Sequence, residues 1–510
     1  MNSSLIFTTA PNSKDTIISN ISWVDYFIFI LVLVICLCTG TGARFFDKIE
    51  ATLSHYLLGG KRMKSLPTAI SLVACHMSSF TLLILPAEVY QYGANYQWIV
   101  VSLFLMCLLK IYIYVPVLYN LQLTSIYEYL ERRFDSKTRL FASILYVFEY
   151  LFLQSMVIYI AALACHTVSG IDSHLLTITV SGMCVLYTTF GSLKSIVWID
   201  IFQMVVQSVA MTTFFLLGVV KQGGPAVVWS NIKTGGRFDI LDFDTDPTKR
   251  DSFWIILIGC TIGWVADVGV NQCTILKYSS VPTFSDCKKA IIYFTIGVAL
   301  VQTGSIVQGL NIYSLYSDCD PVSAAKLEKY DGLVAYYIMD ILKNITGVCG
   351  LFMACTYSAS LSSFSTTLNS LSGVIYKDFV CKATKKSFSE SQALIIVKSI
   401  VFITGILCIL LSFVVEHLGG LFYVASNILS LVNGPQLGMF SLGILIPKAN
   451  SNGAFYGGIV SFISATSITL SAMYYKSKKM LPTFVKPMST AGCGFNHTKF
   501  DDIVVDWTIA

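Results

Sequence analysis

Polar residues that suit a cation interrupt one of the apolar stretches of this sequence. Residues 74–81 combine small and hydroxyl side chains, and Pro86 follows within the same stretch. A helix broken at this point would expose backbone carbonyl oxygens that can coordinate a cation. The alternative is an intact helix whose small residues pack closely against a neighbour.

A second apolar stretch is unusually rich in hydroxyl groups. Residues 358–367 carry Ser or Thr at seven of ten positions. A buried hydroxyl oxygen is a hard, neutral ligand that suits Na⁺ better than a soft metal. Helix packing does not require hydroxyls at this density, so the segment predicts ion coordination.

A carboxylate lies inside a third apolar stretch, where Asp267 stands between Gly263 and Gly269. An acid at such a position is by default a functional group: a counter-ion, a proton relay or a partner for a cationic substrate. Two structural alternatives stay open, an ion pair with Lys110 and a protonated carboxyl with no direct role. For Glu149, in another apolar stretch, a structural role is expected.

The composition explains why these residues sit in apolar surroundings. Of 510 residues, 55% are hydrophobic and 12% are charged, about half the charged share of a soluble protein. The mean hydropathy is +0.69. The net charge of +5 comes with basic residues in short loops, which is a membrane-topology signal and excludes a nucleic-acid partner. Most of the fifteen cysteines lie in apolar runs, and no CxxC zinc pairing or disulfide framework is expected.

The sequence therefore predicts an all-α integral membrane protein with about twelve transmembrane helices. An apolar run of about 20 residues crosses the hydrocarbon core as a helix. Twelve such runs lie near residues 23–43, 66–90, 98–119, 140–165, 174–193, 196–220, 253–276, 290–312, 346–374, 393–415, 419–446 and 453–474.

The loop charges predict the orientation in the membrane. Short loops after the odd-numbered spans carry Lys and Arg, whereas the loops after spans 2, 4 and 10 carry none. Basic loops stay in the cytoplasm, so residues 1–22 are expected outside. One group of residues disagrees: Lys476, Lys478 and Lys479 follow span 12 on the outer side. Either the rule weakens late in the chain or one span is miscounted.

Glycosylation sequons provide an independent check of this orientation. All four fall on the predicted outer side, at Asn2, Asn20, Asn344 and Asn496.

Two motifs carry a resemblance to a known family. Residues 190–203, with Gly191, Trp198, Asp200 and Gln203, resemble one signature of the solute:sodium symporter family, and residues 448–457 resemble the other. Residues 77–93 are most similar to the branch of multivitamin, monocarboxylate and iodide transporters. The likeness extends over about residues 20–475.

This resemblance implies a LeuT-type core inside a single transmembrane domain, residues 23–474. Two inverted five-helix repeats would span residues 66–220 and 253–446, with one additional helix on each side. Because five is odd, the second repeat enters the membrane from the opposite face, which places broken helices at spans 2 and 7.

The resemblance also assigns residues to ions. The family's shared sodium site would use the carbonyls of Ala74, Met77 and Ala359 and the hydroxyls of Ser362 and Ser363. A second sodium site would involve Ser78, Thr81 and Gln154. Asp200 would lie on the inner exit path of the ion.

The solute pocket follows from the same correspondence. Its lining would comprise His76, Phe80, Thr81, Trp264, Asp267, Val268, Phe422 and Ser426. This branch carries no acid at the position of Asp267, and a carboxylate there would repel anions. An anion would still bind if Asp267 were protonated or His76 charged.

The expected function is sodium-coupled import of a small organic solute by alternating access, with Na⁺ as the coupling ion. The solute is expected to be a vitamin- or monocarboxylate-like anion. A neutral or cationic solute, because of Asp267, and a transport-deficient sensor or partner are the alternatives. No paired carboxylates, nucleophile elbow or P-loop indicate an enzyme.

The remaining expectations concern the setting of the transporter. It should be a monomeric transport unit of the plasma membrane. Residues 475–510 should form an extracellular tail that lacks the family's thirteenth helix.

Overall fold

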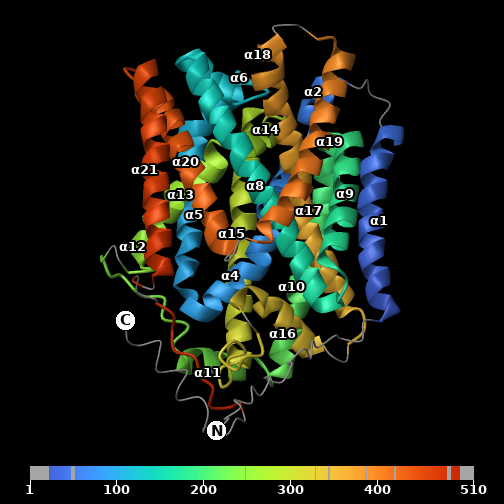
Figure 1. Ribbon diagram of the computed structural model, residues 1–510, viewed down its shortest axis with the longest axis vertical. Coiled ribbons are helices and arrows are strands. Elements are labelled where there is room, and N and C mark those ends of the chain that lie inside the picture. Colours follow the sequence, from blue (N-terminus) through green and yellow to red (C-terminus); the bar gives the residue numbers. More distant parts are fainter. Residues whose placement is uncertain are drawn as a thin grey trace, which may run out of the picture.

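The computed structural model describes residues 22–46, 52–246, 249–327, 329–342, 345–384, 388–417, 421–478, 480 and 484–493. The four sequon asparagines lie outside these residues. Long helices run side by side along the longest axis of the molecule, and short helices cover its two ends (Figure 1).

All twelve expected spans fall on helices of the described chain. They are α1 (Trp23–Phe46), α3 (Ser65–His76) with α4 (Ser79–Tyr92), α5 (Ile99–Leu109) with α6 (Val115–Leu121), α8 (Ser136–Ser169), α9 (Ser173–Phe190), α10 (Leu193–Lys221), α12 (Phe253–Ile255) with α13 (Thr261–Gly269) and α14 (Gln272–Tyr278), α15 (Phe284–Leu315), α17 (Val348–Val374), α19 (Glu390–Val415), α20 (Leu421–Leu445) and α21 (Ser451–Ser477). Shorter helices are α2 (Leu53–Leu58), α7 (Tyr127–Arg133), α11 (Pro225–Thr234), α16 (Leu333–Leu342) and α18 (Cys381–Thr384).

Length and apolarity account for eleven of these spans. Among the described residues, nine helices are long and apolar enough to cross a membrane, and two bent helix pairs raise the number to eleven. The twelfth span, α17, is not apolar enough by hydropathy, because Ser and Thr residues lower its mean value. Almost every residue of α17 is buried by neighbouring helices, so its polar atoms meet protein and not lipid.

Two spans are broken where the sequence places breaks. Helices α3 and α4 meet at Met77–Ser78 with a bend of 59°. The helix that ends at Gly269 and the following α14 are bent by 61°. Asn271 is the N-cap residue before α14, and its side-chain oxygen accepts hydrogen bonds from the amides of Cys273 and Thr274. An Asn cap of this kind satisfies amides that the break leaves without helical partners.

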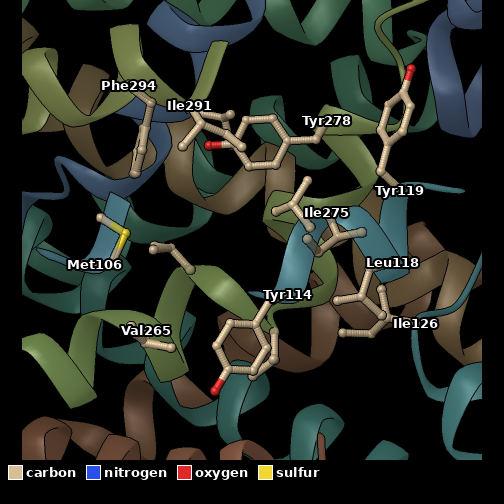
Figure 2. Close-up of a cluster of buried hydrophobic side chains, with 14 of the residues drawn as sticks. Met106, Tyr114, Leu118, Tyr119, Ile126, Val265, Ile275, Tyr278, Ile291 and Phe294 are labelled. Carbon is tan, nitrogen blue, oxygen red and sulfur yellow. The ribbon is translucent and has the colours of Figure 1, made fainter. Parts of the chain in front are cut away.

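A buried apolar cluster fixes the second broken helix in place. It joins α14 to α15 and to the span formed by α5 and α6, and Figure 2 shows Tyr278, Ile291 and Phe294 lying together within it. Tyr114 and Val265 belong to the same cluster. Close packing of these large side chains holds the ends of the break, because van der Waals contact drives the association of helices in a membrane.

The expectation of no disulfide framework is wrong in one place. Cys319 and Cys493, 174 residues apart in sequence, form a disulfide. It attaches residues 484–493 near the end of the molecule that carries α11 and α16. Arg237, which is fully buried, also holds this segment: it donates hydrogen bonds to the carbonyl of Pro487 in the segment and to the carbonyl of Tyr90 in α4. Sequence spacing cannot reveal a pairing over this distance, because the fold alone brings the two cysteines together.

Candidate functional site

The hydroxyls of α17 contact the last turn of α3. Ser362 Oγ lies 2.8 Å from the carbonyl oxygen of Ala74 and 3.1 Å from that of Ala359. Ser363 Oγ lies 3.4 Å from the same Ala359 oxygen and 2.5 Å from the carbonyl oxygen of Cys75. Four of the five oxygens assigned to the first sodium site therefore converge between these two helices.

The break in span 2 explains why α3 offers carbonyls. A helix that ends leaves its last carbonyls without amide partners. Met77, which supplies the fifth assigned oxygen, is the residue at which the chain leaves helical geometry, and it is fully buried. The α17 hydroxyls reach this break between buried segments of the two helices, so a dehydrated ion would find oxygen ligands there.

The residues assigned to a second sodium site share one cavity. Ser78, Thr81 and Gln154 all line it. Gln154 Nε2 donates to Thr367 Oγ1 at 3.0 Å, which fixes the amide plane. The Oε1 atom of Gln154 is buried and has no hydrogen-bond partner among the described residues, so this oxygen is available to a ligand.

That cavity has a volume of about 460 Å³. Its walls come from the two bent spans and from α8 and α20. Pockets of roughly 300–1,000 Å³ suit small molecules. Six of the eight residues assigned to the solute line it, namely His76, Phe80, Thr81, Trp264, Asp267 and Ser426.

The other two assigned residues are placed differently. Val268 is fully buried within the same apolar cluster as Tyr278 and does not line the cavity. It does not share the cavity-facing side of α13 with Asp267, because neighbouring residues on a helix point in different directions. Phe422 begins α20 beside Leu421, and its side chain lies outside the described part of the chain.

Asp267 pairs with a residue that the sequence analysis did not connect to it. Its Oδ2 lies 3.5 Å from His76 Nδ1, and the side chain of Asp267 is 28% exposed. The other ring nitrogen of His76 lies 3.2 Å from Thr274 Oγ1. His76, at the break of the first bent span, therefore contacts residues on both sides of the break in the second.

The alternative of a Lys110–Asp267 ion pair is wrong in this structure. Lys110 Nζ donates to the Tyr278 hydroxyl at 3.1 Å and lies over the rings of Tyr278 and Phe294. A cation held over aromatic faces is stabilised by the ring quadrupoles. Asp267 therefore lines the cavity, with the His76 ring as its neighbour.

Asp200 occupies a buried polar cluster beside α3. Lys277 Nζ lies 3.0 Å from Asp200 Oδ2 and 2.7 Å from Ser71 Oγ. Lys277, which follows the expected span 253–276 and so counted among the basic residues of a short loop, is fully buried in α14. Asp200 Oδ1 has no partner among the described residues, and the Asp200 Oδ2–Thr366 Oγ1 distance is 3.3 Å. A chain of polar groups therefore leads from α17 to Asp200.

A smaller cavity of about 140 Å³ adjoins the large one and shares Phe80, Thr81 and Tyr96 with it. Arg250 lies in its wall, with Glu88 as an ion-pair partner and the ring of Tyr92 3.7 Å away. Burial raises the pKa of the neighbouring Asp251 carboxyl above its ordinary value.

Sequence reasoning missed several polar residues of the cavity wall. Gln302, Ser430, Asn433 and Tyr150 also line it. Gln302 and Asn433 are amides inside apolar spans, a signal that was available. Tyr150 has no such signal, because a tyrosine in a membrane helix is ordinary.

Comparisons with known proteins show the family to which the sequence is similar. A model of the sodium:solute symporter family matches residues 56–461. The sodium-coupled monocarboxylate transporter 1 of Mus musculus is 36% identical over 454 residues, which cover 89% of this chain and 74% of the relative. The sodium/iodide cotransporter of Homo sapiens is 32% identical over 439 residues, or 86% of this chain and 68% of the relative.

A solved structure shows the same fold. A Na⁺-coupled sialic acid symporter in a substrate-bound outward-open state matches with a TM-score of 0.76 at 23% identity, covering 87% of this chain and 96% of its own. The expected LeuT-type fold is thereby confirmed.

Proposed function

The chain belongs to the sodium:solute symporter family, and from this premise we propose that it imports a small monocarboxylate together with sodium. The observation that carries the proposal is the meeting of α17 with the broken span 2 beside a solute-sized cavity. Relatives named as monocarboxylate and iodide transporters support an anionic solute. These relatives are transporters and not enzymes.

Sodium and solute are coupled through the break in span 2. Ser363 contacts the carbonyl of Cys75 and also lines the solute cavity. An ion held by Ala74, Met77, Ala359, Ser362 and Ser363 would order this break, and His76 and Ser78 on its other side face the solute. A ligand that favours one conformation raises the affinity of a second ligand that needs the same conformation.

The solute charge depends on the balance around Asp267. A carboxylate in a low-dielectric cavity needs a compensating positive charge. A second sodium at Ser78, Thr81 and Gln154 and a protonated His76 would supply it. The competing assignment is a neutral or cationic solute, because the carboxylate of Asp267 is partly exposed to the cavity and would repel an anion.

The setting in the membrane forms part of the proposal. Residues 1–22 and 475–510 lie outside the cell, the repeats span 66–220 and 253–446, and one chain is a complete transport unit in the plasma membrane. Asp200 marks the inner exit path, since its carboxylate continues the polar chain that runs from Thr366 on α17. The disulfide at the α11 end supports an oxidising compartment on that side.

Uptake into proteoliposomes tests the proposal. Radiolabelled acetate and lactate should accumulate with an inward Na⁺ gradient and not with choline in its place, whereas neutral amides and cationic amines of the same size should not. Accumulation of the amine, and not of the acids, would replace the monocarboxylate assignment. Uptake that ignores Na⁺ would overturn the coupling.

A further inference from the structure

Two free thiols meet where the broken helices come together. Cys75 is the second-last residue of α3 (Ser65–His76), and Cys273 is the second residue of α14 (Gln272–Tyr278). Their sulfur atoms lie 3.7 Å apart, which is van der Waals contact. Both cysteines are buried, and both line the 460 Å³ cavity. Small molecules that enter this cavity therefore reach the pair.

The register of the two helices holds the sulfurs together. Ser71 lies one helical turn before Cys75, and Lys277 lies one turn after Cys273. Lys277 Nζ contacts Ser71 Oγ at 2.7 Å and Asp200 Oδ2 at 3.0 Å. The same faces of α3 and α14 thus meet at two successive turns, once through the two sulfurs and once through the hydrogen bond that Lys277 donates to Ser71.

The main chain of Cys75 is also tied to α17. Its carbonyl accepts from Ser363, and the carbonyl of the preceding Ala74 accepts from Ser362. A movement of Cys75 therefore displaces the oxygens assigned to sodium.

We propose that Cys75 and Cys273 are a redox-active dithiol, a modification site at which a small peroxide forms a reversible disulfide that stops transport. The effect on transport rests on the proposed function, whereas formation of the bond does not. The pair differs from Cys319 and Cys493, which are already joined and lie away from the cavity lining.

The chemistry balances with hydrogen peroxide as the oxidant. One thiol gives up its proton and its thiolate attacks a peroxide oxygen; an S–O bond forms, the O–O bond breaks, and the departing hydroxide takes up that proton as the first water. The second thiol attacks the resulting sulfenic sulfur; an S–S bond forms, the S–O bond breaks, and the hydroxyl leaves with the proton of the second thiol as the second water. Two thiols and one peroxide give one disulfide and two waters.

The bond would change the geometry of the sodium site. A disulfide holds its sulfurs at about 2.05 Å, so they must approach from their present separation of 3.7 Å. The end of α3 is then drawn toward α14, and the carbonyls of Ala74 and Cys75 move with it. A site that must strip water from an ion tolerates little displacement of its oxygens.

The test treats the full chain in proteoliposomes with hydrogen peroxide and scores two results. Differential alkylation and mass spectrometry should find a peptide that joins Cys75 to Cys273, and Na⁺-driven uptake should fall in proportion to the joined fraction. Dithiothreitol should restore both. Cys75→Ser and Cys273→Ser should each abolish the joined peptide and make uptake resistant to peroxide.

Two matched controls accompany these variants. Cys408→Ser removes a buried thiol whose neighbour is the carbonyl of Leu151, and it should leave inhibition by peroxide unchanged. The pair Cys319→Ser with Cys493→Ser should keep both inhibition and its reversal, which shows that dithiothreitol acts on the cavity pair. If a Ser variant folds poorly, Cys273→Ala replaces it.

Two results would overturn the proposal. One is wild-type protein whose Cys75 and Cys273 stay unjoined while peroxide oxidises other thiols. The other is inhibition that persists in both single variants. Because the joined peptide is detected chemically, its presence is established even if the solute assignment fails, so the two failures are distinguishable.

Discussion

Ser362 and Ser363 occupy adjacent positions on α17, and their hydroxyls meet successive carbonyls of α3. We expect Ser362→Ala to weaken sodium activation of uptake by about tenfold, or about 1.4 kcal/mol, because one ligand oxygen is lost. Maximal uptake at saturating sodium should change less. Sodium titration of uptake measures both quantities.

Ser360→Ala is the matched control for this change. Its hydroxyl donates to the carbonyl of Val157, on α8, and not to α3. Sodium activation should therefore stay close to that of the wild type. If Ser362→Ala and Ser360→Ala weakened sodium activation equally, the α17 hydroxyls would act through packing and the assigned site would be wrong.

Asp267 gives a second prediction at the scale of the residue. Replacement by Asn removes a negative charge from the cavity wall without changing its shape. The apparent affinity for a monocarboxylate should rise relative to that for an amine, with little change in melting temperature. Competition between the two solutes at fixed sodium measures the shift.

Lys110 distinguishes the functional role of Asp267 from a structural one. If the two side chains formed an ion pair, Asp267→Asn would destabilise the protein and Lys110→Met would restore it. Because Lys110 instead contacts Tyr278 and Phe294, we expect the two changes to have additive effects on melting temperature. If each change restored the melting temperature lost through the other, Asp267 would be paired with Lys110 and not with His76.

The sequence located these residues better than it located their partners. A carboxylate or a run of hydroxyls inside an apolar span is visible in one dimension, which identified Asp267, Ser362 and Ser363. The approach of His76 to Asp267 depends on how two bent helices cross, and no local pattern encodes it. Val268 was misassigned for the same reason, since a small rotation of α13 decides which side chain meets the cavity.

At the scale of the element, α15 packs against α4 through a glycine. A Cβ at Gly309 would lie 2.6 Å from the carbonyl oxygen of Pro86 and 2.8 Å from the Cβ of Val89. We expect Gly309→Ala to destabilise the protein by about 1–3 kcal/mol, because overpacking forces the two helices apart. Thermal unfolding in detergent measures the loss.

Gly304 provides the control within the same helix. A Cβ at this position meets nothing within 4 Å, and Ala favours helix over Gly by up to about 1 kcal/mol. Gly304→Ala should therefore be neutral or slightly stabilising. A similar loss of stability at both glycines would contradict the contact with α4 as the cause, because only Gly309 lies against that helix.

The two helix breaks could be predicted from the sequence, whereas the burial of α17 by its neighbouring helices could not. Small and hydroxyl residues around Met77 indicated one interruption, the inverted repeats implied by the family resemblance indicated the other in span 7, and the two bends lie in these spans. Hydropathy alone does not identify α17 as a span. Its polar side chains are buried against neighbouring helices and do not face lipid, so the helix can cross the membrane without being strongly apolar. The helices that enclose it, α8 and α10 among them, are placed by the fold.

At the scale of the whole molecule, the disulfide joins segments that composition cannot relate. Cys319 and Cys493 close a loop of 174 residues, and such links stabilise by about 2–4 kcal/mol, chiefly by restricting the unfolded chain. Cys319→Ser with Cys493→Ser should lower the melting temperature. Dithiothreitol should lower it in the wild type and leave the double variant unchanged; a wild type insensitive to reductant would contradict the link.

The disulfide also constrains the orientation of the entire chain. Cys493 and Asn496 are three residues apart in sequence, so both lie on one side of the membrane. A stable disulfide requires an oxidising compartment, and we therefore expect Asn496 to acquire a glycan that glycosidase removes, as should Asn344. Lysines of the opposite end, such as Lys382, should resist labelling by an impermeant reagent until the membrane is opened. Labelling of Lys382 in intact cells would invert the topology, and Cys493 would then lie in a reducing compartment that does not favour its bond to Cys319.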